Sequence, residues 1–134
     1  MSEPDDSERG VSKTPRGLRR LIAATRYSLA GLASAWRSEA AFRQEVVTAA
    51  FLIPAAFWIG STSVQRVLLA GSVIIVLIVE LLNSAIEHAV DRIGTDHHHL
   101  SGAAKDLASA AVFLSLLLVG ITWGAVLWER FASA

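Results

Sequence analysis

The feature that most constrains this chain is a series of long apolar runs that few charges interrupt. Residues 107–128 form a run of about twenty residues, the length of a helix that crosses a roughly 30 Å hydrocarbon core. Residues 67–79 form a second run, and residues 46–59 a third that Gly60-Ser61-Thr62-Ser63 ends. With 53% hydrophobic and 18% charged residues, the 134-residue chain differs from a soluble domain. We therefore predict an all-α membrane protein with three transmembrane helices.

The flanking segments complete this organisation. Residues 1–15 are rich in Ser, Pro and charge and predict a disordered tail, followed by a single membrane domain over residues 16–134. Apolar residues and arginines recur at helical spacing over about residues 17–38, which predicts an amphipathic helix at the membrane surface. The spans are expected at about residues 42–60, 65–93 and 105–128, with a polar loop, TDHHHLSGAAKD, before the last. The absence of cysteine excludes disulfides, cysteine metal sites and thiol nucleophiles.

Positive charge is concentrated near the N-terminus, since eight of the twelve Lys and Arg precede residue 45. Arg92 and Lys105 flank the second connection, so the positive-inside rule predicts that this connection and the N-terminus are cytoplasmic. The polar, acidic start does not have the pattern of a cleavable signal peptide, so the apolar segments are expected to be retained. We expect no nucleic-acid partner.

Carboxylates interrupt the second apolar segment on one helix face. Glu80, Asn83, Ser84, Glu87 and Asp91 follow the spacing i, i+3, i+4, i+7 and i+11. A carboxylate near the bilayer core costs at least a few kcal/mol, so the chain must either pair these acids or use them. Pairing with Arg, or polar contacts between helices through the Asn and Ser side chains, is the structural alternative.

Two further acids, Glu39 and Glu45, are expected at the same cytoplasmic end, and four acids at one depth indicate a cation site. Carboxylates without a His/Cys cluster suit Mg²⁺, which proteins hold with one or two carboxylates plus substrate phosphates. The basic residues available to phosphate oxygens are Arg20, Arg26, Arg92 and Lys105. A carboxylate without metal can accept the proton of an attacking hydroxyl. Since the chain has no Walker A motif and no kinase Gly-rich loop, phosphoryl transfer would need an unrelated site.

The histidines are weaker signals. Three consecutive residues, His97-His98-His99, cannot all face one ion on a regular element, which favours a nucleotide-contacting or solvated patch over a metal site. His88, inside the helix, is expected to be packed or hydrogen-bonded rather than catalytic.

Three motifs together resemble those of the small integral-membrane diacylglycerol kinases of bacteria. They are EAAFRQE (39–45), ELLNSAIEHAVDRIG (80–94) and LSGAAKDLASAAV (100–112), and the resemblance runs from about Arg20 to Trp128. It implies a homotrimer in the bacterial inner (cytoplasmic) membrane, with active sites between protomers near the cytoplasmic face. It also implies transfer of the γ-phosphoryl group of ATP to 1,2-diacylglycerol, with Mg²⁺ as cofactor and phosphatidic acid as product, in a lipid-recycling role.

The resemblance also implies roles for individual residues. Glu80 corresponds to the proton acceptor, and Glu39 and Glu87 to the carboxylates that hold Mg²⁺ with ATP. Nucleotide contacts are implied for Arg20, Tyr27, Glu39, Glu87, Asp96, His97, His98, Lys105 and Asp106. Lipid contacts are implied for Arg20, Ala24, Thr25, Arg26, Tyr27, Ser28, Leu29, Ala33, Ser34, Ala35, Trp36, Ala41, Phe42, Arg43, Gln44, Glu45, Glu80, Asn83, Ser109 and Trp123. The chain departs from the family at His97 and His99, where we expect an aromatic residue and an acid.

Two alternatives stay open. The related undecaprenol kinases keep the fold and chemistry but use another lipid, although the EAAFRQE motif favours diacylglycerol. A proton or cation conduit is a different class of function, and it needs charges spread through the bilayer depth, whereas residues 67–79 offer no polar relay. A purely structural membrane protein leaves the four acids unexplained.

Overall fold

The computed structural model describes residues 16–132, and these residues form four helices and no strand. The helices are α1 (Arg16–Ser38), α2 (Ala40–Ile59), α3 (Ser63–Ile93) and α4 (His99–Ala132). The tail predicted over residues 1–15 lies outside the described residues. By its internal contacts the chain divides into two units, Met1–Ser34 and Ala35–Ala134, so that most of α1 belongs to the first and the other helices to the second. The all-helical prediction is confirmed.

Three helices, α2, α3 and α4, are long and apolar enough to cross a membrane. The shortest, α2, has 20 residues and at 1.5 Å per residue measures about 30 Å, so it matches the hydrocarbon core by itself. It continues through Pro54, as membrane helices can when their neighbours compensate for the missing N–H. Large apolar side chains such as Phe51, Leu107 and Ile121 are exposed, and lipid or further protein must cover them.

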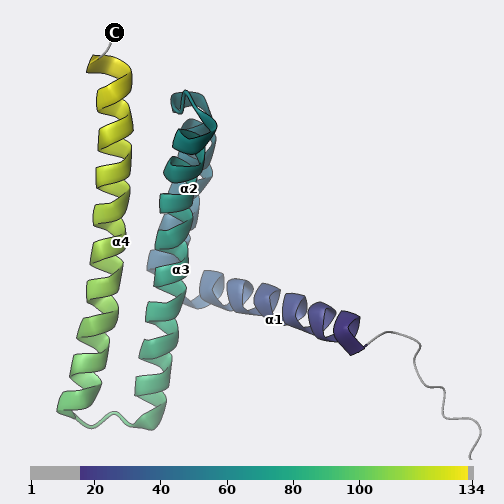
Figure 1. Ribbon diagram of the computed structural model, residues 1–134. Coiled ribbons are helices and arrows are strands. Elements are labelled where there is room, and N and C mark those ends of the chain that lie inside the picture. The colour runs from purple at the N-terminus through teal and green to yellow at the C-terminus, as the bar shows by residue number, and fades with distance from the viewer. Residues whose placement is uncertain (1–15, 133–134) are drawn as a thin grey trace, which may run out of the picture. The chain divides into compact units, whose positions relative to one another are not determined.

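The second unit is organised around α3. In Figure 1 α3 and α4 run antiparallel as a helical hairpin, and α3 packs against both α2 and α4, which share few contacts. The buried residues of α3 form one stripe at helical spacing: Leu69, Ala70, Ser72, Val73, Val76, Glu80 and Ser84. The apolar core lies at the N-terminal end of this stripe, where Leu69 and Ala70 meet Ala56 and Val126. The same stripe that builds the core therefore leads into the acidic face.

The turn between α2 and α3 is fixed by local hydrogen bonds. The Thr62 hydroxyl caps α3 by accepting from the Gln65 N–H at 3.2 Å, and the Gln65 side chain in turn accepts from the Ser61 N–H at 2.8 Å. Gly60 is required by close approach, since a Cβ there would lie 2.7 Å from Cγ of Arg66. The short loop thus returns the chain antiparallel, as the sequence predicts.

The connection between α3 and α4 is shorter than the predicted polar loop. α4 already begins at His99, so the SGAAKD segment is helical rather than loop. The imidazole of His98 explains this early start, because its Nδ1 accepts from the Leu100 N–H at 3.2 Å and satisfies a donor that the first helical turn leaves without an intrahelical partner. Lys105 and Asp106 consequently lie on α4.

Candidate active site

The acidic face of α3 becomes more exposed from residue to residue toward the C-terminus of the helix. Glu80 is only 6% exposed and Ser84 is also buried, whereas Glu87 is half-buried and Asp91 is exposed. Glu80 is therefore the innermost acid on this face, and Glu87 lies two turns closer to the polar end of the helix. A buried carboxylate needs a compensating charge or hydrogen bond, so Glu80 marks this level of the helix as functional.

Three other acids come within electrostatic range of Glu80. Glu80 interacts with Glu87 on its own helix and with Glu39 at the start of α2, and Glu45 of α2 interacts with Glu80. Like charges held together in this way repel one another unless a cation or proton neutralises them. Within residues 16–132, however, no three His, Cys, Asp or Glu side chains are close enough to hold a metal ion. The four acids therefore do not form a complete metal site by themselves.

The residues nevertheless suit Mg²⁺ in the open arrangement that this ion uses with nucleotides. Glu39 and Glu87 offer hard carboxylate oxygens, and in each the polar contacts from neighbouring described residues involve Oε1 only. Among residues 16–132, Oε2 of each carboxylate is left for a ligand. One or two carboxylates with phosphate oxygens and water complete the coordination that Mg²⁺ prefers.

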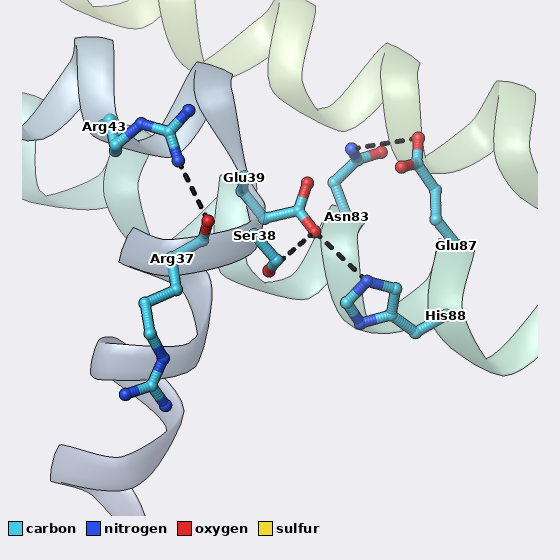
Figure 2. A network of polar contacts seen from close by, with 7 residues as sticks. All are labelled: Arg37, Ser38, Glu39, Arg43, Asn83, Glu87 and His88. Carbon is cyan, nitrogen blue, oxygen red and sulfur yellow. Dashed lines mark hydrogen bonds and ion pairs between the residues drawn. The ribbon is translucent and has the colours of Figure 1, made fainter.

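A polar network surrounds these two carboxylates, as Figure 2 shows. Oε1 of Glu39 lies 3.1 Å from Nε2 of His88 and accepts from the Ser38 hydroxyl at 3.3 Å. The Asn83 side-chain amide donates to Oε1 of Glu87 at 3.4 Å. The contact between His88 and Glu39 was not anticipated from the sequence, because it joins two residues far apart in the chain that only the packing of α2 on α3 brings together.

Arg43 has a different environment from the one expected for a lipid-contacting residue. Its guanidinium NH1 donates to the carbonyl oxygens of Trp36 at 3.0 Å and Arg37 at 3.1 Å, which lie in the last turn of α1 (Figure 2 shows the bond to Arg37). Helix C-termini leave such carbonyls without intrahelical donors, so Arg43 caps the helix that precedes its own. Glu39 is the single residue between α1 and α2, and this capping explains how two helices meet so closely without glycine or proline.

The expected nucleotide residues of the second unit lie where α3 ends and α4 begins. A hollow of about 470 Å³ there is lined by Asp96 and His98 together with Val90, Ile93, Gly94, Leu100, Ser101 and Ala104. Nζ of Lys105 lies 2.7 Å from Oδ1 of Asp91, an exposed ion pair that joins α4 to the acidic face. Lys105 therefore already has an anionic partner that a phosphate group must displace or share.

The other expected lipid residues are divided among several environments. Phe42 and Ala35 are buried, and Trp36, Ala41 and Ser109 are exposed. A second hollow of about 280 Å³ is lined by Gln44, Glu45, Thr48, Ala49, Leu52, Val73, Val76, Leu77, Leu116 and Val119. Oε2 of Glu45 is buried there without a hydrogen-bond partner among the described residues. A polar group at the head of an apolar hollow suits a lipid better than water.

Trp123 does not lie beside Glu80. Its indole N–H donates to the Leu69 carbonyl at 3.2 Å, and its ring packs on the apolar core. Leu69 is roughly 16 Å from Glu80 along α3 at 1.5 Å per residue. The remaining expected residues lie on α1 within the first unit, namely Arg20, Ala24, Thr25, Arg26, Tyr27, Ser28, Leu29, Ala33 and Ser34. Their membership of the site stays a prediction.

Comparison with known proteins finds relatives along most of the chain. A family model described as prokaryotic diacylglycerol kinase matches residues 26–127. The chain is 53% identical over 112 residues to a diacylglycerol kinase of Haemophilus influenzae, a match covering 84% of this chain and 95% of that protein. A diacylglycerol kinase of Escherichia coli K12 is 50% identical over 121 residues, covering 90% and 99%. One from Pseudomonas aeruginosa is 48% identical over 115 residues, covering 86% and 94%.

Proposed function

The chain belongs to the prokaryotic diacylglycerol kinase family, and we propose that it transfers the γ-phosphoryl group of ATP to the free hydroxyl of 1,2-diacylglycerol. The product is phosphatidic acid, which returns diacylglycerol to phospholipid synthesis. The observation that carries the proposal is the burial of Glu80 beside Glu39 and Glu87 in a helix long and apolar enough to span a membrane. A buried acid at that position suits a substrate whose hydroxyl arrives from the bilayer.

In the proposed mechanism Glu80 is the general base. Its carboxylate accepts the proton of the diacylglycerol hydroxyl while the hydroxyl oxygen forms a bond to the γ-phosphorus of ATP. The bond between that phosphorus and the oxygen bridging to the β-phosphate breaks, and ADP leaves. Such transfers pass through a loose transition state, so positioning and charge stabilisation supply most of the catalysis. Burial of Glu80 also keeps water, the competing acceptor, away from the reacting groups.

Glu39 and Glu87 would hold Mg²⁺ through their available oxygens, together with the ATP phosphates. When bound, the ion neutralises charge on those phosphates. Lys105 is close to the same face through its pair with Asp91 and contacts a phosphate oxygen in this proposal. Asp96 and His98 line the hollow at the start of α4, and we assign this hollow to the nucleoside part of ATP.

For the lipid we assign the hollow between α2, α3 and α4. Gln44 and Glu45 lie at its polar part, and the apolar residues from α3 and α4 suit the first carbons of an acyl chain. The exposed apolar faces of α2 and α4 support a homotrimer in the bacterial inner membrane, with the acidic face toward the cytoplasm and α1 on the membrane surface.

The experiment offers two acceptors to the purified protein in mixed micelles with γ-labelled ATP and Mg²⁺. Labelled phosphatidic acid from diacylglycerol supports the proposal, with loss of product expected when a chelator removes Mg²⁺. In a competition, undecaprenol should take up little label. Preferential labelling of undecaprenol would overturn the lipid assignment. Proton flux into proteoliposomes without ATP, and no labelled lipid, would instead favour the conduit.

A further inference from the structure

The contact between His88 and Glu39 has no role in the mechanism described so far. His88 belongs to α3 and its side chain is 64% exposed, whereas the side chain of Glu39 is 21% exposed. Nε2 of His88 lies 3.1 Å from Oε1 of Glu39. The imidazole nitrogen and the carboxylate oxygen are therefore in direct polar contact. An exposed imidazole that bonds a carboxylate assigned to a cation site is a candidate for controlling that carboxylate.

Glu39 has few other constraints on its side chain. It occupies the N-cap position of α2, where an acidic side chain often accepts from the first N–H groups of the helix, yet its side chain makes no such bond. Its hydrogen bond from Ser38 and its contact with His88 both involve Oε1. A glutamate side chain loses considerable rotamer entropy when it is fixed, so donors that hold it in advance lower the cost of binding a cation.

Glu87, the second carboxylate proposed to hold Mg²⁺, also has a polar partner that holds its side chain. Asn83 donates to Oε1 of Glu87 at 3.4 Å. Each carboxylate therefore has a polar partner on α3 at Oε1, and among the described residues Oε2 is left for a ligand. Figure 2 shows Asn83 and His88 projecting from α3 toward the two acids. Carboxylates that bind metals commonly have outer hydrogen-bond partners of this kind, which orient them.

We propose that His88 is a positioning residue: through the contact between its Nε2 and Oε1 of Glu39, it orients that carboxylate so that Oε2 binds the Mg²⁺ that accompanies ATP. This role rests on the proposed function, because it assumes that Glu39 is a metal ligand. His88 touches neither substrate nor reacting atoms, so its removal should weaken metal binding while the chemical step at saturating metal is kept.

The test measures metal binding without turnover, using Mn²⁺ as a paramagnetic substitute for Mg²⁺ and the β,γ-imido analogue of ATP. Free Mn²⁺ is quantified by electron paramagnetic resonance with the full-length protein in detergent. His88→Ala is expected to weaken Mn²⁺ binding about tenfold, the lower end of the effect of removing an outer partner of a metal ligand. His88→Gln, whose amide can donate to the same oxygen, is expected to restore binding to within about threefold. In turnover, His88→Ala should raise the KM for Mg²⁺ and leave kcat nearly unchanged.

A double-mutant cycle with Glu39→Gln separates this role from the proposed function. If His88 acts through Glu39, His88→Ala has no further effect once Glu39→Gln is present. An equal effect in both backgrounds, or an unchanged Mn²⁺ affinity in His88→Ala, overturns the positioning role alone. Unchanged Mn²⁺ affinity in Glu39→Gln itself overturns the metal assignment within the proposed function.

Discussion

Polar residues lie at both ends of the three-helix unit, but they are used differently. At the end where α2 meets α3, NH1 of Arg130 donates to the carbonyl oxygens of Ile59 at 2.6 Å and Trp58 at 3.4 Å. The Arg66 side chain donates to the Gly60 carbonyl at 2.9 Å, and the Gln65 amide donates to Glu129 at 3.0 Å. The two arginines satisfy carbonyls where α2 ends, so the cations here serve the fold.

At the acidic end some buried polar atoms lack a partner among the described residues. The side-chain amide of Asn83 donates a hydrogen bond to Oε1 of Glu87 at 3.4 Å. Two buried oxygens, Oδ1 of Asn83 and Oε2 of Glu45, have no partner among residues 16–132. Buried polar atoms without partners cost stability, so natural proteins keep few of them. The comparison teaches that charge in a membrane helix is structural where every group is paired, and indicates a site where groups are left for a ligand.

The prediction with the largest expected effect compares the loss of one acid at each end of the three-helix unit. Glu80→Gln removes the proposed base, and we expect kcat to fall by about 10²- to 10⁴-fold, the usual contribution of a general base. Glu129→Gln is the matched control at the structural end, because the introduced amide oxygen can still accept from Gln65. It should keep turnover within about twofold. Phosphatidic acid formation and the oligomer size in detergent measure both variants, and equal activity of the two would contradict the distinction between the ends.

A second prediction tests the structural end through stability. Arg130→Ala leaves two carbonyls without their donor and removes the guanidinium 5.6 Å from the Trp58 ring. We expect the free energy of unfolding in detergent to fall by about 1–3 kcal/mol, the range for hydrogen bonds from a charged group. Turnover at low temperature should be unchanged. A large loss of kcat with unchanged stability would show that this end takes part in catalysis.

The sequence was sufficient for the helices and for the acidic face, because both depend on local periodicity. Long apolar runs predict spans, and the spacing from Glu80 to Asp91 puts the polar residues on one side of α3 whatever its neighbours are. The increase in burial from Asp91 to Glu80 follows from the same pattern, since the helix passes from a polar end into apolar sequence.

The contacts that orient the site could not be predicted, because they depend on tertiary packing or on unusual caps. Nothing local to Glu39 indicates that His88 will reach it. Arg43 belongs to a motif for which lipid contacts were expected, and in the structure it caps α1. The imidazole of His98 caps the start of α4, so this helix begins earlier than the turn-forming residues suggested. The sequence thus located the acidic face of α3, while the contacts around it required the structure.

The smallest expected effect concerns an ion pair within the acidic end, Asp91 of α3 with Lys105 of α4. Both side chains are largely exposed, so the pair contributes little to stability, and its charge is available to compete with ATP for Lys105. In Asp91→Asn we expect the KM for ATP to fall about twofold at low ionic strength, with the difference shrinking as salt screens the charges. Initial rates at two salt concentrations measure this. A raised KM would mean that Asp91 holds Lys105 in place for the phosphates. The pair would then support the site, as His88 and Glu39 do, and Asp91 would not compete with ATP for Lys105.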